Sequence, residues 1–266
     1  MTDPTTNEAL ALDTSVPHSA RIWNYWLGGK DHYAIDRETG DEILRIAPGM
    51  ITYARADRAF LGRAVRYVAE EAGIRQFLDI GTGLPTVDNT HEVAQRVAPD
   101  SRVVYVDNDP LVLAHARALL TSTPEGATDY LHADLEDPDL ILDAAARTLD
   151  FGRPVAIMLL GVVNYVADDG EAHSIVKRLL DAVPSGSHLV LSHTSVGPGT
   201  DEAVEHWNQH GTPKLTQRTK AQVAELFTGL ELVEPGVVAC SHWRPEATPW
   251  GEPEEVHIVC GVGRKL

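Results

Sequence analysis

The sequence predicts an α/β protein with a doubly wound, mostly parallel seven-stranded sheet, an antiparallel edge strand and an N-terminal helical extension. Three observations predict this class. From residue 74 onward, short apolar segments alternate with amphipathic ones, as in repeated β–α units. Residues 155–160 are apolar throughout, which is typical of a parallel strand covered on both faces. Near residue 230 two strand-like segments follow one another with no helix between them, which predicts antiparallel pairing.

Three regions of different character divide the 266 residues. Residues 1–16 are polar and carry no sustained hydrophobic period, so we expect a disordered lead-in. Residues 17–73 form the predicted helical extension, in which apolar side chains recur on one helix face from Phe60 to Ala69. Residues 74–266 are expected to form the α/β domain.

Capping residues mark the helices that follow the first strands. The strand Gln76–Ile80 leads through a glycine turn to a helix over Asn89–Val97. The strand Arg102–Asp107 precedes Asp109, a capping carboxylate followed by proline at the first helical position. A short third strand comes next, and Asp137, again followed by proline, repeats this helix start.

The second half of the domain contains the remaining strands. After the apolar strand Val155–Leu160, we expect a helix around Glu171–Ala182 and a strand over His188–Ser192. Thr219 and Gln222 have the spacing of a capping box, which opens a further helix. Two strands should then pair antiparallel at one sheet edge, namely about Glu231–Cys240 and Val256–Gly261.

Composition and charge exclude several classes of function. The formal charge is −17, and no dense block of Lys and Arg could follow a phosphate backbone or an anionic membrane surface. The longest apolar run, Val155 to Val163, is nine residues, whereas a bilayer-spanning helix needs ~20. We therefore expect neither a nucleic-acid nor a membrane partner.

No secretory signal precedes Arg21, and Cys240 and Cys260 are too few for a disulfide framework. We therefore expect a cytoplasmic protein with both cysteines in its core.

The segment after the first strand predicts a ligand-binding turn. Asp79 is the last residue but one of this strand, and the chain then turns through Gly81 and Gly83 into a helix. Glycines allow positive φ and let a ligand lie against bare backbone, and nucleotides bind at this first turn in open α/β sheets. A turn with a purely structural role is the alternative, because a Gly-x-Gly pattern alone is weak evidence.

Two further acids favour the ligand-binding interpretation. Asp107 ends the second strand, where a carboxylate can accept hydrogen bonds from both hydroxyls of a ribose. Asp134 follows the third strand at the same sheet edge and can accept one from an adenine amine. Three acids together are costly unless a cationic or donor-rich ligand lies among them. We therefore expect a ligand beside Asp79, Asp107 and Asp134.

The ligand expected at this edge is S-adenosylmethionine rather than a dinucleotide. A dinucleotide site requires Gly or Ala three residues after Gly83, and Thr86 stands there. Asp79 would also repel a pyrophosphate. S-adenosylmethionine carries an ammonium, a sulfonium, a ribose and an adenine but no phosphate, and this inventory suits an acidic site.

The chain resembles the class I S-adenosylmethionine-dependent methyltransferases. Asp79-x-Gly81-x-Gly83 matches their first motif, Asp107 matches their ribose-binding acid, and Asp134 matches the acid beside the adenine. The resemblance implies a Rossmann-like sheet and an enzyme that transfers a methyl group from S-adenosylmethionine, with S-adenosylhomocysteine as product.

The likeness extends to one family, abundant in actinomycetes, whose methyl acceptor is generally unassigned. It covers almost everything after Pro17, and its most specific part is the Leu-Gly-Gly-Lys-Asp segment over 27–31. Asn164 departs from the pattern, because we expect a His in relatives at this position. The resemblance therefore supports no proton transfer by Asn164.

The resemblance implies a set of cofactor-binding residues. They are Asp79, Gly81, Thr82 and Gly83 at the methionine end, Asp107 and Asn108 at the ribose, Asp134 and Leu135 at the adenine, and Gly161 and Val162 beside the reacting methyl. The N-terminal segment would close over the cofactor through Tyr25, Gly29 and Lys30.

Catalysis of methyl transfer from a sulfonium requires mainly alignment of acceptor, methyl and sulfur, and exclusion of water. A general base is needed only if the nucleophile arrives protonated, and the candidates are His193, which ends the fifth strand, and Tyr165. The sequence secures neither of them as a catalytic residue. No residues have metal-ligand spacing with a full ligand set, so we expect no metal.

These observations predict a methyltransferase that acts on a small molecule, with residues 194–215 shaping the acceptor pocket. The acceptor, the methylated atom and the oligomeric state are not assigned by the sequence. Two alternatives stay open. One is a non-catalytic sensor that binds S-adenosylmethionine or S-adenosylhomocysteine, and the other is an NAD-dependent dehydrogenase, which Thr86 and Asp79 disfavour.

Overall fold

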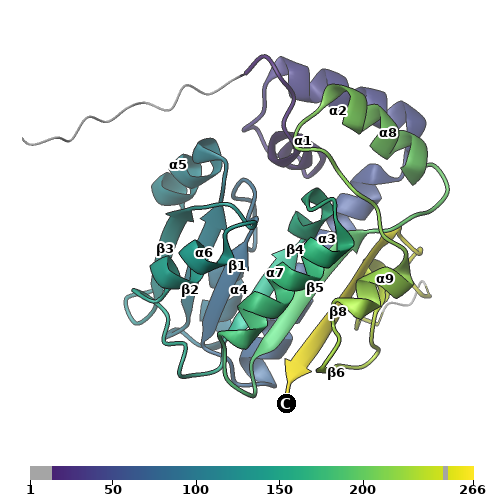
Figure 1. Ribbon diagram of the computed structural model, residues 1–266. Helices are drawn as coiled ribbons and strands as arrows, with labels where there is room; N and C mark the ends of the chain where they lie inside the picture. The colour runs from purple at the N-terminus through teal and green to yellow at the C-terminus, as the bar shows by residue number, and fades with distance from the viewer. Residues whose placement is uncertain (1–13, 248–250) are drawn as a thin grey trace, which may run out of the picture.

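A central sheet runs through the molecule in the computed structural model, which describes residues 14–247 and 251–266 (Figure 1). Its strands are β1 (Gln76–Ile80), β2 (Arg102–Asp107), β3 (Ala127–His132), β4 (Ala156–Leu160), β5 (His188–Thr194), β6 (Leu230–Leu232), β7 (Val238–Ala239) and β8 (Ile258–Lys265). Seven of the strands follow one another in the order β3-β2-β1-β4-β5-β8-β6, and β7 also pairs with β8.

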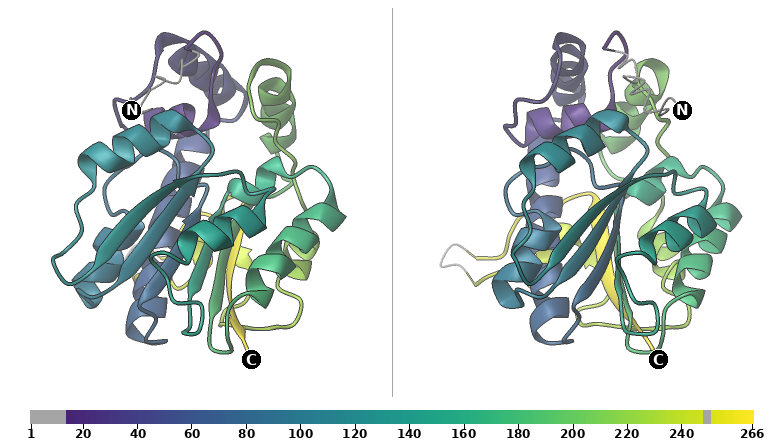
Figure 2. Two further views of the ribbon diagram at one scale, coloured as in Figure 1. Left: turned by 60° about the vertical axis from the view of Figure 1, so that its left-hand side comes forward. Right: turned by 90° about the vertical axis from the view of Figure 1, so that its left-hand side faces the viewer.

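Helices cover both faces of this sheet (Figure 2). They are α1 (Ser19–Trp26), α2 (Ala34–Ile46), α3 (Met50–Glu70), α4 (Thr90–Val97), α5 (Pro110–Leu119), α6 (Pro138–Ala145), α7 (Asp169–Asp181), α8 (Thr200–His210) and α9 (Lys220–Glu225). Helices α3 and α4 pack on one face, α6, α7 and α9 on the other, and α5 contacts β2 and β3. No helix within the two described ranges is long and apolar enough to cross a membrane.

The strand pairing confirms the predicted fold class. Strands β1 to β5 are parallel, and the sheet order places β4 on the side of β1 opposite to β2. Strand β8 is antiparallel to β5, β6 and β7, as expected for the last strands. The single strand expected over 231–240 is instead two short strands, because Pro235 lacks an N–H for the ladder and Gly236 turns the chain with a φ of +85°.

The helix starts expected from capping residues are also confirmed. The carboxylates of Asp109 and Asp137 accept hydrogen bonds from first-turn N–H groups at 2.8 and 3.1 Å. Thr219 accepts one from Gln222, whose side-chain oxygen accepts one in return from the Thr219 N–H at 2.9 Å. Each cap satisfies N–H groups that the first turn of a helix leaves without an intrahelical partner.

The core consists of apolar strands packed between the helices. Residues 156–159 of β4 and 188–193 of β5 are buried, as a sheet covered on both faces requires. Cys240 and Cys260 lie in the same core as free, buried thiols, as expected.

A helical cover, consisting of α1, α2 and α8, lies over the carboxyl ends of the parallel strands (Figures 1 and 2). It has an apolar cluster of its own, formed by Ile22, Trp26, Ile43, Ala47, Ala54, Ala203 and Trp207. The second half of α3 packs on the sheet instead, through residues such as Phe60 and Val65. The predicted domain boundaries at 16/17 and 73/74 stay predictions, and most of the expected lead-in lies outside the described residues.

A buried ion pair holds α1 to α2 within the cover. The Arg21 Nε lies 3.0 Å from both carboxylate oxygens of Asp36, and both side chains are buried. Asp36 also accepts hydrogen bonds from the backbone N–H groups of His18 at 3.0 Å and Tyr33 at 2.8 Å. A buried ion pair is tolerated when its remaining lone pairs are satisfied in this way.

We expect Asp36→Ala to destabilise the helical cover, because Arg21 would keep a buried charge without its carboxylate. Removing one partner of a buried pair costs about 3–5 kcal/mol. Amide hydrogen exchange should accelerate over residues 17–46 and stay unchanged in β1 and β4. Glu38→Ala, which removes an exposed carboxylate from the same helix, is the control. Unaltered exchange over 17–46 in Asp36→Ala would contradict this role of the pair.

Candidate functional site

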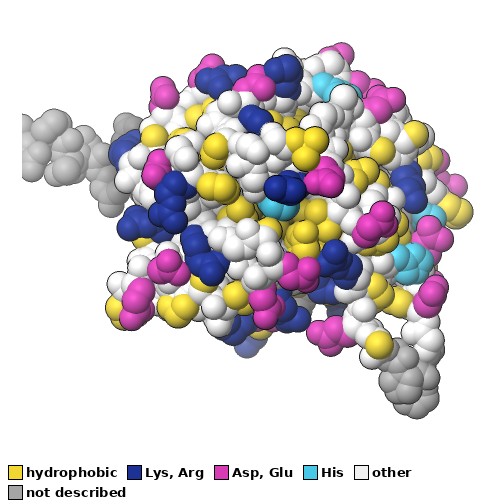
Figure 3. Space-filling view, turned by 90° about the horizontal axis from the view of Figure 1, so that it is seen from below, with side chains coloured by type: hydrophobic (Ala, Val, Ile, Leu, Met, Phe, Trp, Pro, Cys, Tyr) yellow, Lys and Arg dark blue, Asp and Glu magenta, His cyan; other side chains and the backbone are white. Residues whose placement is uncertain are grey.

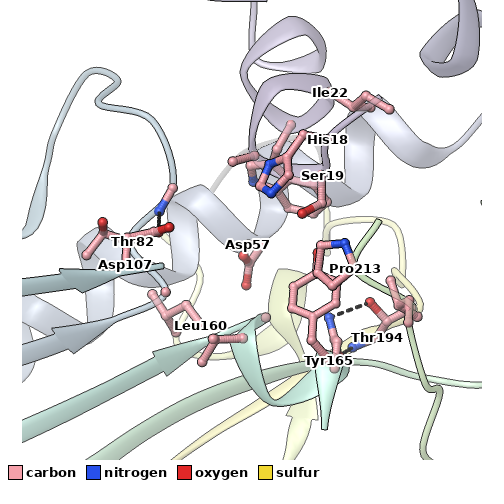
Figure 4. Close-up of a pocket in the computed structure, with 18 of the residues that line it drawn as sticks. His18, Ser19, Ile22, Asp57, Thr82, Asp107, Leu160, Tyr165, Thr194 and Pro213 are labelled. Atoms are coloured by element: carbon pink, nitrogen blue, oxygen red, sulfur yellow. Dashed lines mark hydrogen bonds between the residues drawn. The ribbon is translucent and has the colours of Figure 1, made fainter. Parts of the chain in front are cut away.

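A cavity of about 300 Å³ lies between the carboxyl ends of the parallel strands and the helical cover. In Figure 4, Asp107 lies on one side of it, Tyr165 on the other, and His18 of the cover above. The cavity is at the position between β1 and β4 where the strand order reverses. Ligands of open α/β sheets bind at this topological switch point.

The glycine turn after β1 forms part of the cavity wall. Gly81 has a φ of +73° and Gly83 a φ of +63°, which only glycine adopts readily. At Gly81 a side chain is excluded a second time, because a Cβ there would overlap Val162. The close approach of Val162 therefore requires glycine at this position, whereas at Gly83 the backbone conformation alone requires it.

Asp79 is buried at the end of β1 beside this turn. Its carboxylate accepts a hydrogen bond from the Thr90 hydroxyl at 2.5 Å. Burial raises the pKa of Asp79 to about 6, and the charge of Asp107 adds to this rise, while the Thr90 hydroxyl and the Arg58 guanidinium offset part of it. Ionised Asp79 is therefore stabilised by any donor or positive charge that enters the cavity.

Asp107 is the buried acid at the end of β2. One oxygen accepts a hydrogen bond from the Gly83 N–H at 2.9 Å, and the other accepts one from the Asp109 N–H at 2.9 Å. Burial nevertheless raises the pKa of Asp107 to about 6. Two carboxylates with raised pKa values thus face one cavity, which favours a cationic or donor-rich ligand.

The predicted adenine-side residues form the rim of the cavity. Asn108 and Asp134 are exposed there, and the Asn108 amide donates a hydrogen bond to the Asp134 carboxylate at 2.8 Å. Leu135 is buried and presents an apolar wall. This part of the wall combines an apolar surface with a carboxylate and an amide, which suits the face and edge of a heterocyclic base.

The segment after β4 lies opposite the acids. Gly161 and Val162 line the cavity, as does Tyr165, whose hydroxyl hydrogen-bonds to Ser19 of the cover and whose pKa is raised by burial. Asn164 joins this segment to the end of β5. Its side-chain oxygen accepts from the Thr194 N–H at 2.9 Å, and its amide donates to the Thr194 hydroxyl at 3.1 Å. Asn164 is thus a structural bracket in the cavity wall.

His193 does not line the cavity, in contrast to what a general base would require. It is fully buried, and its Nε2 accepts a hydrogen bond from the Arg218 guanidinium at 2.9 Å. Its Nδ1 lies 2.8 Å from the carbonyl oxygen of Thr194, so both ring nitrogens are engaged. Burial lowers the pKa of His193 to about 4. The geometry gives this histidine no access to an acceptor.

The cover residues expected as ligand contacts also lie away from the cavity wall. The Tyr25 hydroxyl donates to Asp41 of α2 at 2.8 Å, and Lys30 is exposed to solvent. Gly29 leaves room for the side chain of Asn24, which a Cβ would overlap. It is Asn24 that lines the cavity, so Gly29 contributes to the wall only by allowing that packing.

Several cavity residues carry no signal in the sequence. They are His18 and Ser19 at the start of α1, Asp57 and Arg58 of α3, and the apolar side chains Ile22, Trp23, Trp26, Ile43, Met50 and Leu61. The helical spacing of apolar residues shows that these helices have a buried face, but it does not show that this face lines a cavity. The segment expected to shape the acceptor pocket does line the cavity, through Thr194, Thr200, Ala203, Val204, Trp207, Pro213 and Leu215.

The cavity therefore has two unlike halves. One half contains the acids and the glycine turn, and the other, lined by residues of α1, α2 and α8, is mainly aromatic and aliphatic. Within the described ranges, no three His, Cys, Asp or Glu side chains lie close enough to hold a metal ion.

Comparison with known protein families assigns the chain. The model of the S-adenosyl methyltransferase family matches residues 5–266, so the chain belongs to that family. It is an S-adenosylmethionine-dependent methyltransferase of class I, as the sequence motifs predict, and the dehydrogenase alternative is set aside. No match to the chain was found among curated proteins.

Solved structures share the fold over most of the chain. A DUF574 family protein from Streptomyces avermitilis is 46% identical, with 96% of this chain and 99% of that chain covered and a TM-score of 0.91. A protein from Thermobifida fusca named as a candidate methyltransferase is 40% identical, with 98% and 99% covered and a TM-score of 0.88. The magnesium protoporphyrin IX methyltransferase from Synechocystis, with S-adenosylhomocysteine bound, shares the fold at 12% identity, 92% and 93% coverage and a TM-score of 0.53.

The cavity fits the cofactor of this family. Asp79 and Asp107 are buried carboxylates that the chain neutralises only in part, and S-adenosylmethionine offers an ammonium and two ribose hydroxyls. Gly81 and Gly83 leave the backbone bare where side chains would narrow the cavity. No phosphate has to be placed against these acids. The hydrogen-bond donors and the positive charge of the cofactor therefore match the acceptors that the site offers.

We expect the affinity for S-adenosylhomocysteine to weaken as the pH falls below about 6. Asp79 and Asp107 have raised pKa values of about 6, so acid protonates them and removes the charge that the ligand's donors require. The dissociation constant should be flat above about pH 7 and rise by up to tenfold per pH unit for each proton taken up. Calorimetric titration from about pH 8 to about pH 5 measures this. A dissociation constant independent of pH over that range would contradict the electrostatic fit.

Proposed function

We propose that the chain transfers a methyl group from S-adenosylmethionine to a small-molecule acceptor inside the covered cavity. One observation carries this proposal: a single cavity joins an acidic half at the first strand ends to an apolar half beneath the helical cover. The first half suits the cofactor, and the second leaves room for an acceptor next to it. A binding protein for the cofactor alone has no need of the apolar half.

The residues that would hold the cofactor come from three strand ends. Asp79 and the turn from Gly81 to Gly83 would bind the methionine portion, Asp107 and Asn108 the ribose, and Asp134 and Leu135 the adenine. Gly161 and Val162 would lie beside the methyl group. S-adenosylmethionine, when bound, supplies a methyl group on a positively charged sulfur, which needs no covalent activation by the protein.

The chain's own contribution is alignment and the exclusion of water. The cover residues His18 and Ser19 close the cavity from above, and Ser19 is joined to Tyr165 below. Asn164 fixes the ends of β4 and β5 relative to each other. Such positioning of two reactants can supply ~7–11 kcal/mol of the barrier. His193 lies outside the cavity wall, so this scheme gives it no role as a base.

Charge supports a small molecule rather than a nucleic acid as acceptor. The formal charge of the chain is −17. On the face opposite the cover, acidic and basic side chains are interspersed, without a continuous basic stripe (Figure 3). A phosphate backbone binds to clustered Lys and Arg, so the surface favours an acceptor that enters the cavity.

The proposal is tested by incubating the purified protein with S-adenosylmethionine and small-molecule fractions of a cell extract, and by measuring S-adenosylhomocysteine. Product should form only in the presence of an acceptor fraction, and Asp107→Ala should form less of it at a cofactor concentration that does not saturate the variant. Product that forms only with nucleic acid or protein fractions would overturn the small-molecule assignment. Cofactor binding without product in any fraction would favour the sensor alternative.

We expect Asp107→Ala to weaken binding of S-adenosylhomocysteine at least about tenfold, a loss of ~1.4 kcal/mol, because the buried ribose-side acceptor is removed. Calorimetric titration measures the dissociation constant. The matched control is Asp143→Ala, since Asp143 is an exposed carboxylate of α6 outside the cavity. Equal affinities of Asp107→Ala and the wild type would show that the strand-end acids do not bind the cofactor.

A further inference from the structure

Asp57 is a buried carboxylate that the proposed cofactor contacts do not use. It comes from α3, and Figure 4 shows its side chain entering the cavity between the side of Asp107 and the side of Tyr165. Leu160, the last residue of β4, lies below it in the same view. Asp57 is therefore placed at the junction of the acidic and the apolar half of the cavity.

The chain leaves this carboxylate with weak partners. Asp57 is 8% exposed, and the Cys240 thiol lies 3.6 Å from one of its oxygens, with the Ser192 hydroxyl as a second contact. Thiols are weak donors. Within residues 14–247 and 251–266, no ion pair includes Asp57. The neighbouring Arg58 guanidinium acts on Asp57 through its charge, while its hydrogen bond goes to the carbonyl oxygen of Val87 at 2.9 Å.

The surroundings of Asp57 on the cover side are mainly apolar, although His18, Ser19 and Asn24 also line the cavity there. The cavity wall there includes Trp23 and Trp26, whose ring centroids are 6.0 Å apart, together with Ile22, Met50, Leu61, Trp207 and Leu215. A buried carboxylate with weak partners is costly in such a place. The cost is offset when a bound molecule brings one donor group to Asp57 and apolar surface to the wall.

We propose that Asp57 binds the nucleophilic group of the acceptor, and that the acceptor is a largely apolar, ring-containing molecule with an amine or hydroxyl. This inference rests on the proposed function. The nitrogen or oxygen of the acceptor forms a bond to the methyl carbon, and the bond from that carbon to sulfur breaks with its electron pair remaining on sulfur. The proton of the nucleophile passes to the Asp57 carboxylate and then to solvent. Asp57 therefore both orients the acceptor and takes its proton.

The test compares three probes of one shape on the full chain saturated with S-adenosylhomocysteine: 2-naphthylmethylamine, 2-naphthylmethanol and 2-methylnaphthalene. We expect the amine and the alcohol to bind to the wild type at least about tenfold more tightly than the hydrocarbon, because only they donate to a buried carboxylate. Equal binding of all three probes to the wild type would overturn the inference without any variant being needed.

Asp57→Asn, which keeps the size of the side chain, supplies the second arm. The variant should lose the preference for the amine over the hydrocarbon and keep the wild-type affinity for S-adenosylhomocysteine. Asp143→Asn, exposed on α6, is the control and should change neither. If Asp57→Asn weakens the binding of S-adenosylhomocysteine as much as the binding of the amine, Asp57 belongs to the cofactor half and the inference is wrong. If the wild type fails to bind S-adenosylhomocysteine, the proposed function itself fails.

Discussion

The burial of two like charges at adjacent strand ends is the constraint on which the rest of the site depends. Parallel pairing sets Asp79 of β1 opposite Tyr105 of β2, so that Asp79 and Asp107 reach the same sheet edge. Burial raises the pKa of each to about 6, above the usual carboxyl value, and Arg58 offsets only part of this at Asp79. Their ionisation therefore lowers the free energy of unfolding as the pH rises toward 6. Burial of the apolar strands offsets this loss of stability, and a ligand rich in hydrogen-bond donors reduces it.

Much of the fold could be predicted because its signals are local. Strands β1 and β2 have the predicted bounds, since each is a short, mainly apolar run with an acid at or next to its last residue, before a turn. The capping carboxylates Asp109 and Asp137 similarly fix their helix starts. The sequence predicts one strand over 231–240, although Pro235 and Gly236 interrupt it. The two short strands on either side of this interruption, β6 and β7, both pair with β8, so the sheet keeps them on one line as a single strand would be.

The candidate site also has one part that the sequence predicts and another that it does not. The topology of a parallel sheet predicts the position of residues at or just after a strand end, such as Asp79 and Gly161, and both do line the cavity. The cover was not predictable, because a helical period indicates which face is buried but not what that face covers. Tyr25, which the sequence predicts as a ligand contact, is instead hydrogen-bonded to Asp41 of α2. The cover contributes His18 to the cavity wall in its place. Asp57 meets Cys240 across 183 residues, a contact for which no spacing in the sequence could give a signal.

The cover contains a fully buried ion pair, whereas the polar contacts that join its residues to α5 are partly exposed. Within the cover, the charges of Arg21 and Asp36 are buried and fully paired. Toward α5, the Nδ1 of His18 lies 3.5 Å from the Asp109 carboxylate, and burial lowers the pKa of His18, so this contact carries little charge near neutral pH. Partly exposed pairs of this kind are worth ~0–1 kcal/mol. The contact between His115 of α5 and Asp31 is of the same kind, at 3.7 Å, and apolar packing of Ala20 against Leu111 and Val112 adds to what holds α1 to α5. Loss of one such polar contact therefore costs less than loss of one partner of the buried pair.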